Sequence, residues 1–291
     1  MKPIGKLAIF GVGLIGGSFA LALRAAGAVG EIVGVGRSVE NLQAALEIGA
    51  IDRVAATAAD ALDNADLVLL AMPVGQMGAV MANIAPHLQA GCVVTDAGST
   101  KQDVVALARQ YLPEHLAWFV PGHPIAGAEH SGVKAARGDL YHGRNVVLTP
   151  LPENTQAALE KVDAAWRACG ANVAHTTAAN HDSVFAAVSH LPHLLAFALV
   201  NDIAAKPNAE ELFRHAASGF RDFTRIAASS PEMWRDICLA NRIALLHELE
   251  AYQAQLARLH DMLENGDGAA LEQVFDNASQ ARRKWATDKG L

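Results

Sequence analysis

The chain has 291 residues, of which 52% are hydrophobic and 18% are charged, a composition that excludes a mainly disordered protein. At roughly 150 residues per domain, this length predicts about two domains. The formal net charge of -7 disfavours nucleic acid as a partner, because binding through a basic surface needs clustered lysines and arginines. Three widely spaced cysteines, Cys92, Cys169 and Cys238, are typical of reduced thiols in a cytoplasmic protein, so we expect no disulfide and no zinc.

The sequence indicates neither secretion nor a membrane span. The N-terminal residues lead directly into a strand-like segment at 7–10, without the basic, apolar and cleavage-site regions of a signal peptide. We also expect Gly or charged residues to interrupt each apolar stretch before it reaches the roughly 18 residues that a membrane span requires.

Short β-branched apolar segments alternate with Ala- and Leu-rich helical patterns in the first half of the chain. Strands that alternate with helices predict an α/β fold of the Rossmann type, a doubly wound parallel sheet with helices on both faces. The expected strands are residues 7–10, 32–35, 67–70, 93–95 and 146–148, followed by a helix at 154–168 and a last strand at 171–177.

From Asn180, which we predict as a helix N-cap, the sequence has helical patterns throughout. We therefore predict a dinucleotide-binding domain at 1–177 and an all-helical substrate-binding and dimerisation domain at 178–291. One long helix carries an apolar seam that fits either an intramolecular core or a dimer interface. The seam consists of Leu245, Leu249, Tyr252, Leu256, Leu259 and Leu263.

A glycine-rich turn, Gly-Val-Gly-Leu-Ile-Gly, follows the first strand and opens a helix, and this context predicts a dinucleotide site. Gly11 allows the tight turn, Gly13 lets the backbone approach a pyrophosphate, and Gly16 lets the helix pack on the strand. The N–H groups of the first helical turn, including Leu14 and Ile15, favour the anion.

The second predicted strand ends in Arg37 and Ser38, where an NAD-specific site usually has an acidic residue for the ribose 2′-hydroxyl. A guanidinium and a hydroxyl suit a 2′-phosphate, so we predict NADP as the preferred cofactor, with NAD also usable. If Arg37 is only a solvated charge or stacks on adenine, both cofactors stay open. Pro73 follows the strand at 67–70 and marks the carboxyl edge of the sheet, where the cofactor is expected.

Two loops after predicted strands carry candidate catalytic groups. Ser99 lies in Asp-Ala-Gly-Ser-Thr-Lys, a sequence that is also ordinary turn chemistry. His123 lies between two prolines in Pro-Gly-His-Pro. It is a candidate general base, because the ordinary pKa of histidine is near ~6.5, and a structural histidine is the alternative.

Taken in order, five segments resemble the prephenate/arogenate dehydrogenase family of tyrosine biosynthesis. Many dehydrogenases share the first of them, whereas the last three are specific, and together they span nearly the whole chain. The segments are the glycine-rich turn at 11–18, Asp-Ala-Gly-Ser-Thr-Lys at 96–101, Gly-His-Pro with Gly-Ala-Glu-x-Ser-Gly at 122–132, Ser-His-Leu-Pro-His at 189–193, and Gly-Phe-Arg-Asp-Phe-Thr-Arg-Ile-Ala at 219–227.

The resemblance implies an oxidative decarboxylation, in which C4 of a cyclohexadienol gives a hydride to the nicotinamide and the ring carboxylate departs as CO₂. His123 would accept the proton of the C4 hydroxyl and must be neutral, so activity should fall with falling pH, while Ser99 would orient the hydroxyl and the nicotinamide. Arg225 would hold a substrate carboxylate through a bidentate pair, with a structural ion pair as the alternative. His190, on a helix bent at Pro192, would face the substrate.

Arogenate and prephenate, the substrates that the resemblance implies, differ in a side-chain ammonium versus a keto group. Glu232 resembles the acidic position of arogenate-preferring members and modestly favours arogenate, whereas the alternative is a helix capping box formed by Ser229 and Glu232. Glu129 resembles an acidic loop residue of the family and would pair with Arg225.

We further expect a monofunctional enzyme that forms a homodimer and is inhibited competitively by tyrosine. His190 and His193 have a spacing that metal ligands can have, but no carboxylate or Cys cluster accompanies them, so we expect no metal. The alternatives are another NADP-dependent Rossmann dehydrogenase and a non-catalytic NADPH-sensing binding protein. Neither needs His123, Ser99 and Arg225 around one site.

Overall fold

The computed structural model describes residues 3–127 and 132–289. The chain divides into two compact units, Met1–Arg242 and Ile243–Leu291. The first unit contains both the strands and the helices α1 to α11, and the second is helical. The boundary at 177/178 between a dinucleotide-binding and a substrate-binding domain stays a prediction.

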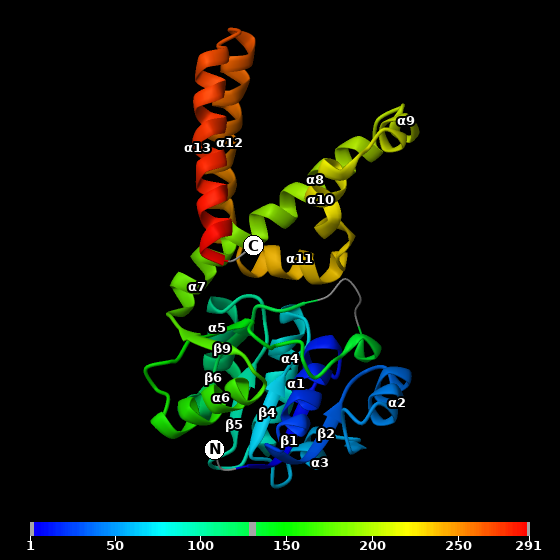
Figure 1. Cartoon of the computed structure of the whole chain (residues 1–291). Helices are drawn as coiled ribbons and strands as arrows, with labels where there is room; N and C mark the ends of the chain where they lie inside the picture. The colour runs from blue at the N-terminus through cyan, green and yellow to red at the C-terminus, as the bar shows by residue number, and fades with distance from the viewer. Residues whose placement is uncertain (1–2, 128–131, 290–291) are drawn as a thin grey trace. The chain divides into compact units, whose positions relative to one another are not determined.

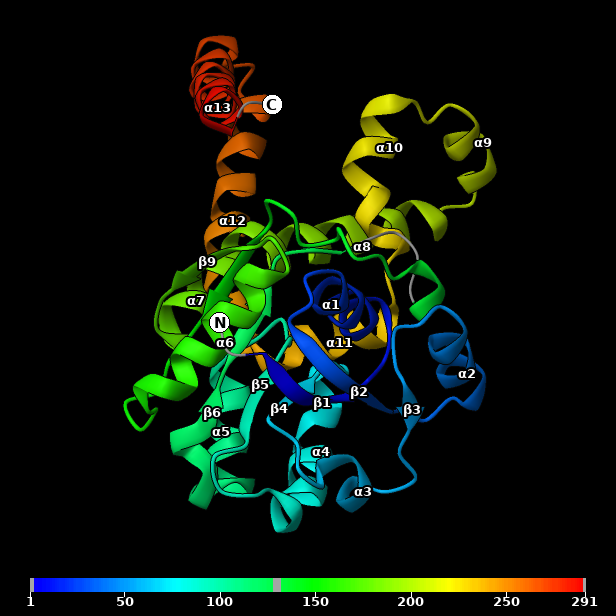
Figure 2. The same ribbon diagram turned by 60° about the horizontal axis from the view of Figure 1, so that its bottom comes forward.

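A six-stranded parallel sheet confirms the predicted Rossmann-type fold (Figures 1 and 2). Its order, β3-β2-β1-β4-β5-β6, is that of a dinucleotide-binding doubly wound sheet. β4, between β1 and β5, is apolar and buried along its whole length because both faces of the sheet are covered. The strands are β1 (Ile4–Phe10), β2 (Val29–Val35), β3 (Arg53–Val54), β4 (Leu67–Leu70), β5 (Val93–Asp96) and β6 (Phe119–Val120).

Six helices cover the two faces of this sheet and build a core on each. Phe19 of α1 and Trp166 of α6 pack together in one core, with ring centroids 4.5 Å apart, and Met77 of α4 and Val104 of α5 lie in the other. The helices are α1 (Leu14–Ala25), α2 (Val39–Glu47), α3 (Ala58–Leu62), α4 (Val74–Ile84), α5 (Gln102–Tyr111) and α6 (Gln156–Ala168).

A second, three-stranded sheet differs from the sequence-based prediction. The segments expected at 146–148 and 171–177 do not extend the parallel sheet but form β8 (Asn145–Leu148) and β9 (Asn172–His175). They pair with β7 (Gly122–Pro124), which runs antiparallel to β8. Pro121 separates β7 from β6 and has no N–H for a sheet ladder, so the chain leaves the main sheet there. His123 is the central residue of β7.

The remaining elements of the first unit are helical. Thr177 rather than Asn180 caps the first of them, because its hydroxyl accepts a hydrogen bond of 3.1 Å from the Asn180 N–H. A π-helical turn precedes Pro192, whose nitrogen cannot donate to the Val188 carbonyl. The elements are α7 (Ala178–Phe185), the π-helical turn Ala186–His190, α8 (Leu191–Ala204), α9 (Ala209–Arg214), α10 (Ser218–Thr224), the 3-10 turn Arg225–Ala228 and α11 (Pro231–Ala240).

The continuous helical run at 178–204 corrects the expectation about apolar stretches. Residues 183–201 contain neither Gly nor Asp, Glu, Lys or Arg, so by length and composition alone this run could cross a membrane. Only 22% of its most apolar window is buried within the chain. An exposed apolar helix of this kind is equally what a subunit interface requires.

The second unit is a hairpin of two long helices, α12 (Arg242–Glu264) and α13 (Gly268–Lys289), which lie side by side (Figures 1 and 2). The predicted seam on α12 is only partly covered. Leu249, Tyr252 and Leu259 are half-buried, whereas Leu256 and Leu263 are 47% and 68% exposed. The hairpin by itself therefore does not provide an intramolecular core for the whole seam.

Candidate active site

The glycine-rich turn has the geometry that a pyrophosphate needs. Gly11 has a φ of 95°, and a Cβ there would lie 2.7 Å from the Ala71 carbonyl oxygen. A Cβ at Gly16 would lie 2.9 Å from Ile9 Cγ2. No atom lies within 4 Å of a Cβ built on Gly13, which begins α1 without a side-chain cap. The turn thus fits a dinucleotide, because the backbone at Gly13 has open space beside it at the start of a helix, where a pyrophosphate binds.

The first turn of α2, which follows β2, holds an acidic residue, Glu40, that sequence reasoning missed. Ser38 caps α2 by accepting from the Asn41 N–H at 3.1 Å, and its hydroxyl donates to Glu40 Oε2 at 2.9 Å. Backbone and Ser38 hydrogen bonds lower the pKa of the exposed Glu40 carboxyl. Arg37 is exposed, as a 2′-phosphate ligand should be. Glu40 must turn away from such a phosphate, but it could accept a hydrogen bond from a 2′-hydroxyl.

The glycine-rich turn and the His123 strand meet at one edge of the sheet. Phe10, Leu70 and Asp96 are register partners across β1, β4 and β5, so the residues that follow them lie at the same carboxyl edge. Pro73 is the N-cap residue of α4 at this edge. Gly122, the first residue of β7, lies at the same carboxyl edge, because its N–H donates a hydrogen bond to Asp96 Oδ1 at 3.1 Å.

A fully buried ion pair connects the Ser99 loop with β7. Lys101 Nζ contacts Asp96 Oδ2, and the Gly122 carbonyl also accepts from Lys101 Nζ at 2.8 Å. Asp96 Oδ2 accepts from the Gly98 N–H at 2.7 Å as well. Since Ser99 lies between these groups in sequence and His123 follows Gly122, the pair positions both candidate catalytic residues.

His123 is partly accessible, and within the described ranges a hydrogen bond reaches it on one side only. Its Nδ1 lies 2.9 Å from His181 Nε2, and the Phe185 ring lies 4.9 Å from it, centroid to centroid. Burial, followed by the positive charges of His181, Lys101 and His190, keeps the pKa of His123 well below 6.5. The side chain is therefore a neutral imidazole at neutral pH, as a proton acceptor must be.

Asp182 completes this group and is anchored on α5. Its Oδ1 lies 2.8 Å from His181 Nδ1. The N–H groups of Lys101 and Gln102 donate to Oδ1 and Oδ2, each at 2.8 Å. Although burial alone would raise the pKa of the Asp182 carboxyl, hydrogen bonds from His181 and from these N–H groups lower it. Burial lowers the pKa of His181, which Asp182 partly offsets.

The structure places His190 in the interior, where it is 1% exposed. Its Nδ1 lies 3.0 Å from Asn241 Nδ2, which also donates to the Asp182 carbonyl at 2.8 Å. Burial lowers the pKa of His190 to about 4. Its Nε2 is buried without a partner among the described residues. Whether this N–H faces the substrate stays a prediction.

His193, which we considered only as a metal ligand, belongs with Trp234 and Arg225. Its ring stacks on Trp234 with centroids 3.6 Å apart, and its Nδ1 lies 2.9 Å from the Ser189 carbonyl oxygen. Burial and the nearby Arg225 charge lower the pKa of His193. Arg225 begins the 3-10 turn and is exposed. The metal-type grouping found in the described ranges, His260, Asp261 and Glu264, is an exposed set on α12 instead.

The two candidate acidic residues have different outcomes. Glu232 is exposed in the first turn of α11, and Ser230 caps this helix by accepting from the Met233 N–H at 3.4 Å. The alternative for Glu232, a capping box with Ser229, is therefore wrong, because Ser230 and not Ser229 caps the helix. Glu129 lies outside the described residues, so its pairing with Arg225 stays a prediction.

Comparisons with known proteins agree with this arrangement. The family model described as prephenate dehydrogenase, nucleotide-binding domain, matches residues 19–175, and the one described as prephenate dehydrogenase, dimerization domain, matches residues 177–277. The chain belongs to the prephenate dehydrogenase family. A relative named cyclohexadienyl dehydrogenase, from Zymomonas mobilis, is 36% identical to this family member over 100% of this chain and 99% of its own length.

Solved structures of family members also superpose on the chain. Prephenate dehydrogenase from A. aeolicus, in complex with hydroxyphenyl propionate and NAD⁺, has a TM-score of 0.90 and 35% identity, covering 97% of this chain and 98% of its own. Arogenate dehydrogenase from Synechocystis has a TM-score of 0.81 and 28% identity, covering 96% and 99%. The chain is thus an oxidoreductase with a nucleotide-binding domain that fits a nicotinamide cofactor.

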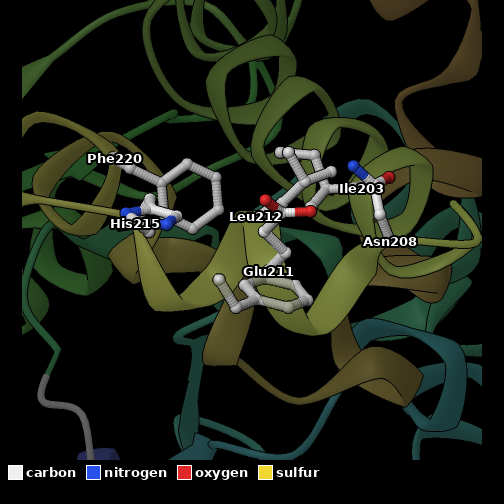
Figure 3. A pocket seen from close by; sticks show the side chains of 8 residues that line it. Ile203, Asn208, Glu211, Leu212, His215 and Phe220 are labelled. Carbon is white, nitrogen blue, oxygen red and sulfur yellow. The ribbon is translucent and has the colours of Figure 1, made fainter.

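A separate hollow of about 320 Å³ lies among α8, α9 and α10. Figure 3 shows Ile203, Leu212 and Phe220 around it, with Glu211 and His215 beside them. None of its lining residues belongs to the His123 site, so it adds nothing to the dehydrogenase chemistry.

Proposed function

We propose that the chain oxidises and decarboxylates cyclohexadienols in tyrosine biosynthesis, acting on arogenate and on prephenate, with arogenate and NADP preferred. The observation that carries this proposal is His123, a neutral imidazole whose Nδ1 is hydrogen bonded to His181. Through Gly122, the Lys101–Asp96 pair holds this residue at the carboxyl edge of the sheet, where the glycine-rich turn also lies. A nicotinamide-sensing protein without turnover has no use for such a base.

The proposed roles follow from the chemistry of the side chains. His123 Nε2 accepts the proton of the substrate C4 hydroxyl, and Ser99 orients that hydroxyl. Arg225 binds a substrate carboxylate, because its planar guanidinium can donate two parallel hydrogen bonds. A bound nicotinamide supplies the hydride acceptor, while loss of the ring carboxylate as CO₂ makes the ring aromatic. His190 lines the site beside Ser99, whose backbone contributes to the pKa of His190.

Cofactor preference depends on Arg37 and Glu40, which act in opposite directions. Arg37 supports NADP through its charge, whereas Glu40, hydrogen bonded to Ser38, disfavours a 2′-phosphate. We propose that Arg37 dominates, because Glu40 is exposed and can rotate into solvent. NAD is then a usable but weaker cofactor.

The decisive experiment crosses arogenate and prephenate with NADP and NAD and follows reduced cofactor at 340 nm. We expect the highest kcat/KM for arogenate with NADP. Faster turnover with NAD would assign Arg37 to an ordinary loop charge. Absence of turnover with all four combinations would overturn the proposed function in favour of another dehydrogenase or a sensor.

Substrate preference is expected to depend on Glu232. Its exposed carboxylate lies in the first turn of α11, two residues before Trp234, and can pair with the arogenate ammonium. In Glu232→Gln, the ratio of kcat/KM for arogenate over prephenate should fall at least ~tenfold, roughly 1.4 kcal/mol. An unchanged ratio would remove Glu232 from the specificity site. Glu210→Gln, an exposed acid in the first turn of α9, is the matched control.

We also propose a homodimer in the cytoplasm, inhibited competitively by tyrosine. The match to a dimerization-domain model and the exposure of apolar side chains support the dimer, including Val188 at 66% and Leu239 at 63%. Light scattering should give twice 30.6 kDa.

The three free cysteines are compatible with a reducing compartment. Tyrosine is the product of the oxidative decarboxylation of arogenate, so as a competitive inhibitor it should raise KM and leave kcat unchanged.

A further inference from the structure

Behind His123 lies a line of hydrogen-bonding groups that the family motifs did not include. His123 Nδ1 lies 2.9 Å from His181 Nε2, and His181 Nδ1 lies 2.8 Å from Asp182 Oδ1. His181 and Asp182 are each 1% exposed, whereas His123 is partly accessible. The line thus runs from a buried carboxylate to an imidazole that can meet a ligand.

Asp182, the acceptor at the buried end, determines which ring nitrogen of His181 and of His123 carries a proton. Asp182 accepts two backbone N–H groups from the start of α5, so it is an ionised carboxylate with no proton to donate. His181 must therefore donate to it from Nδ1, which leaves His181 Nε2 as an acceptor in the neutral ring. His123 must in turn donate from Nδ1, which leaves His123 Nε2 unprotonated.

We propose that Asp182 and His181 are positioning residues that hold His123 as its Nδ1–H tautomer, with Nε2 open to the substrate hydroxyl. The inference rests on the proposed function for its chemical meaning, though not for its geometry. When Nε2 accepts the hydroxyl proton, His123 becomes an imidazolium whose Nδ1–H stays hydrogen bonded to His181. The carboxylate of Asp182, two hydrogen bonds away, stabilises that new charge.

The other groups around His123 disfavour its protonated form, so His123 needs the hydrogen-bonded line of His181 and Asp182 to accept a proton. The positive charges of Lys101, just before α5, and of His190, in the π-helical turn, disfavour the protonated form of His123, and burial does the same. Phe185 covers it with an aromatic ring. Among these neighbours Asp182 supplies the negative charge that reaches His123 through a hydrogen-bonded ring, so removing the line should impair proton transfer more than binding.

The kinetic test compares two substitutions of His181. His181→Phe keeps a flat ring but removes the acceptor, so kcat should fall roughly 10²-fold or more with KM nearly unchanged. His181→Gln has an amide oxygen that can accept from His123 Nδ1, so it should recover kcat to within about tenfold of wild type. His175→Phe is the matched control, since His175 also bonds a carboxylate, Asp163 at 3.0 Å, but is exposed on β9. It should leave kcat unchanged.

Asp182→Asn tests the direction of the protons. A side-chain amide can donate to His181 Nδ1, which would reverse both tautomers and place a proton on His123 Nε2. Two-bond ¹H–¹⁵N spectra of histidine-labelled protein at pH 8 report each tautomer without substrate. The wild type should have Nδ1–H at His123 and His181, and folded Asp182→Asn should have Nε2–H at His123. Signals are assigned by their loss in His123→Asn and His181→Gln.

The outcomes separate this inference from the proposed function. An Nε2–H tautomer at His123 in the wild type overturns the inference whatever the activity. If the enzyme turns over but His181→Phe keeps the same kcat as His175→Phe, the inference is also overturned, while the proposed function stands. Wild-type tautomers as expected, with no turnover of arogenate or prephenate, would support the positioning line and reject the proposed function.

Discussion

Replacing His123 with Asn should lower kcat for the cyclohexadienol substrates by roughly 10²- to 10⁴-fold, the usual contribution of a general base. KM should change little, because His123 accepts a proton in the transition state, whereas Arg225 and Glu232 are proposed to bind the substrate carboxylate and ammonium. Steady-state kinetics at pH 8 with both substrates measure the effect. A loss below tenfold would leave His123 as a structural histidine, the alternative that the sequence left open.

The pH dependence of kcat gives this prediction its sign. The active form of His123 is neutral and predominates above its pKa in the folded protein, which burial and neighbouring positive charges hold well below 6.5. Activity should therefore stay constant as the pH falls through 6.5 and decline only further into the acid range. An acid limb centred at pH 6.5 would mean that substrate or cofactor binding restores an ordinary histidine pKa.

The stability of the fold also decreases as the pH falls, so this loss must be separated from the loss of catalytic rate. His190, with a pKa lowered to about 4, stays neutral in the folded chain while the unfolded chain takes up a proton near pH 6.5. The unfolded state then binds more protons, so the free energy of unfolding decreases as the pH falls below about 6.5. Enzyme incubated at acid pH and assayed at pH 8 distinguishes loss of fold from protonation of His123.

Local patterns predicted the cofactor half of the site well. The glycine-rich turn is a contiguous motif, and the direction of parallel strands places whatever follows them at one edge. Glu40 was missed because the search for an acid stopped at the end of β2, whereas the helix start brings Glu40 back to Ser38. The antiparallel pairing of β7 was also missed, since a three-residue strand that follows Pro121 and ends at Pro124 is too short to show a period.

The inner half of the site lacked a local signal. His181 lies 58 positions from His123 in sequence, and Asp182 lies 81 positions from Lys101, so only the fold brings these groups together. On its own, Asn-His-Asp at the start of a helix has the composition of an ordinary first turn. His190 was predicted from its motif, but its hydrogen bond with Asn241, 51 positions away, could not be. The polar contacts of a buried site depend on tertiary packing, which short motifs do not encode.

Replacing the buried Lys101 with Met, which removes the positive charge of the Lys101–Asp96 pair, should cause a large loss of stability for a single substitution. Both side chains are fully buried, and Lys101 Nζ also serves the Gly122 carbonyl. Met fills a similar volume but leaves the Asp96 carboxylate buried without its cation, which costs roughly 3–5 kcal/mol of unfolding free energy. Asp96 keeps the Gly98 and Gly122 N–H groups, so the chain should still fold.

Urea unfolding followed by tryptophan fluorescence, at a fixed protein concentration, measures this loss. Lys206→Met is the matched control, because Lys206 forms an exposed pair with Asp202 at 2.8 Å and should change the unfolding free energy by less than about 1 kcal/mol. If Lys101→Met cost no more than Lys206→Met, the ion pair would not hold the sheet edge together. Since Lys101 also fixes Gly122 beside His123, the folded variant should lose kcat as well, and Lys206→Met should not.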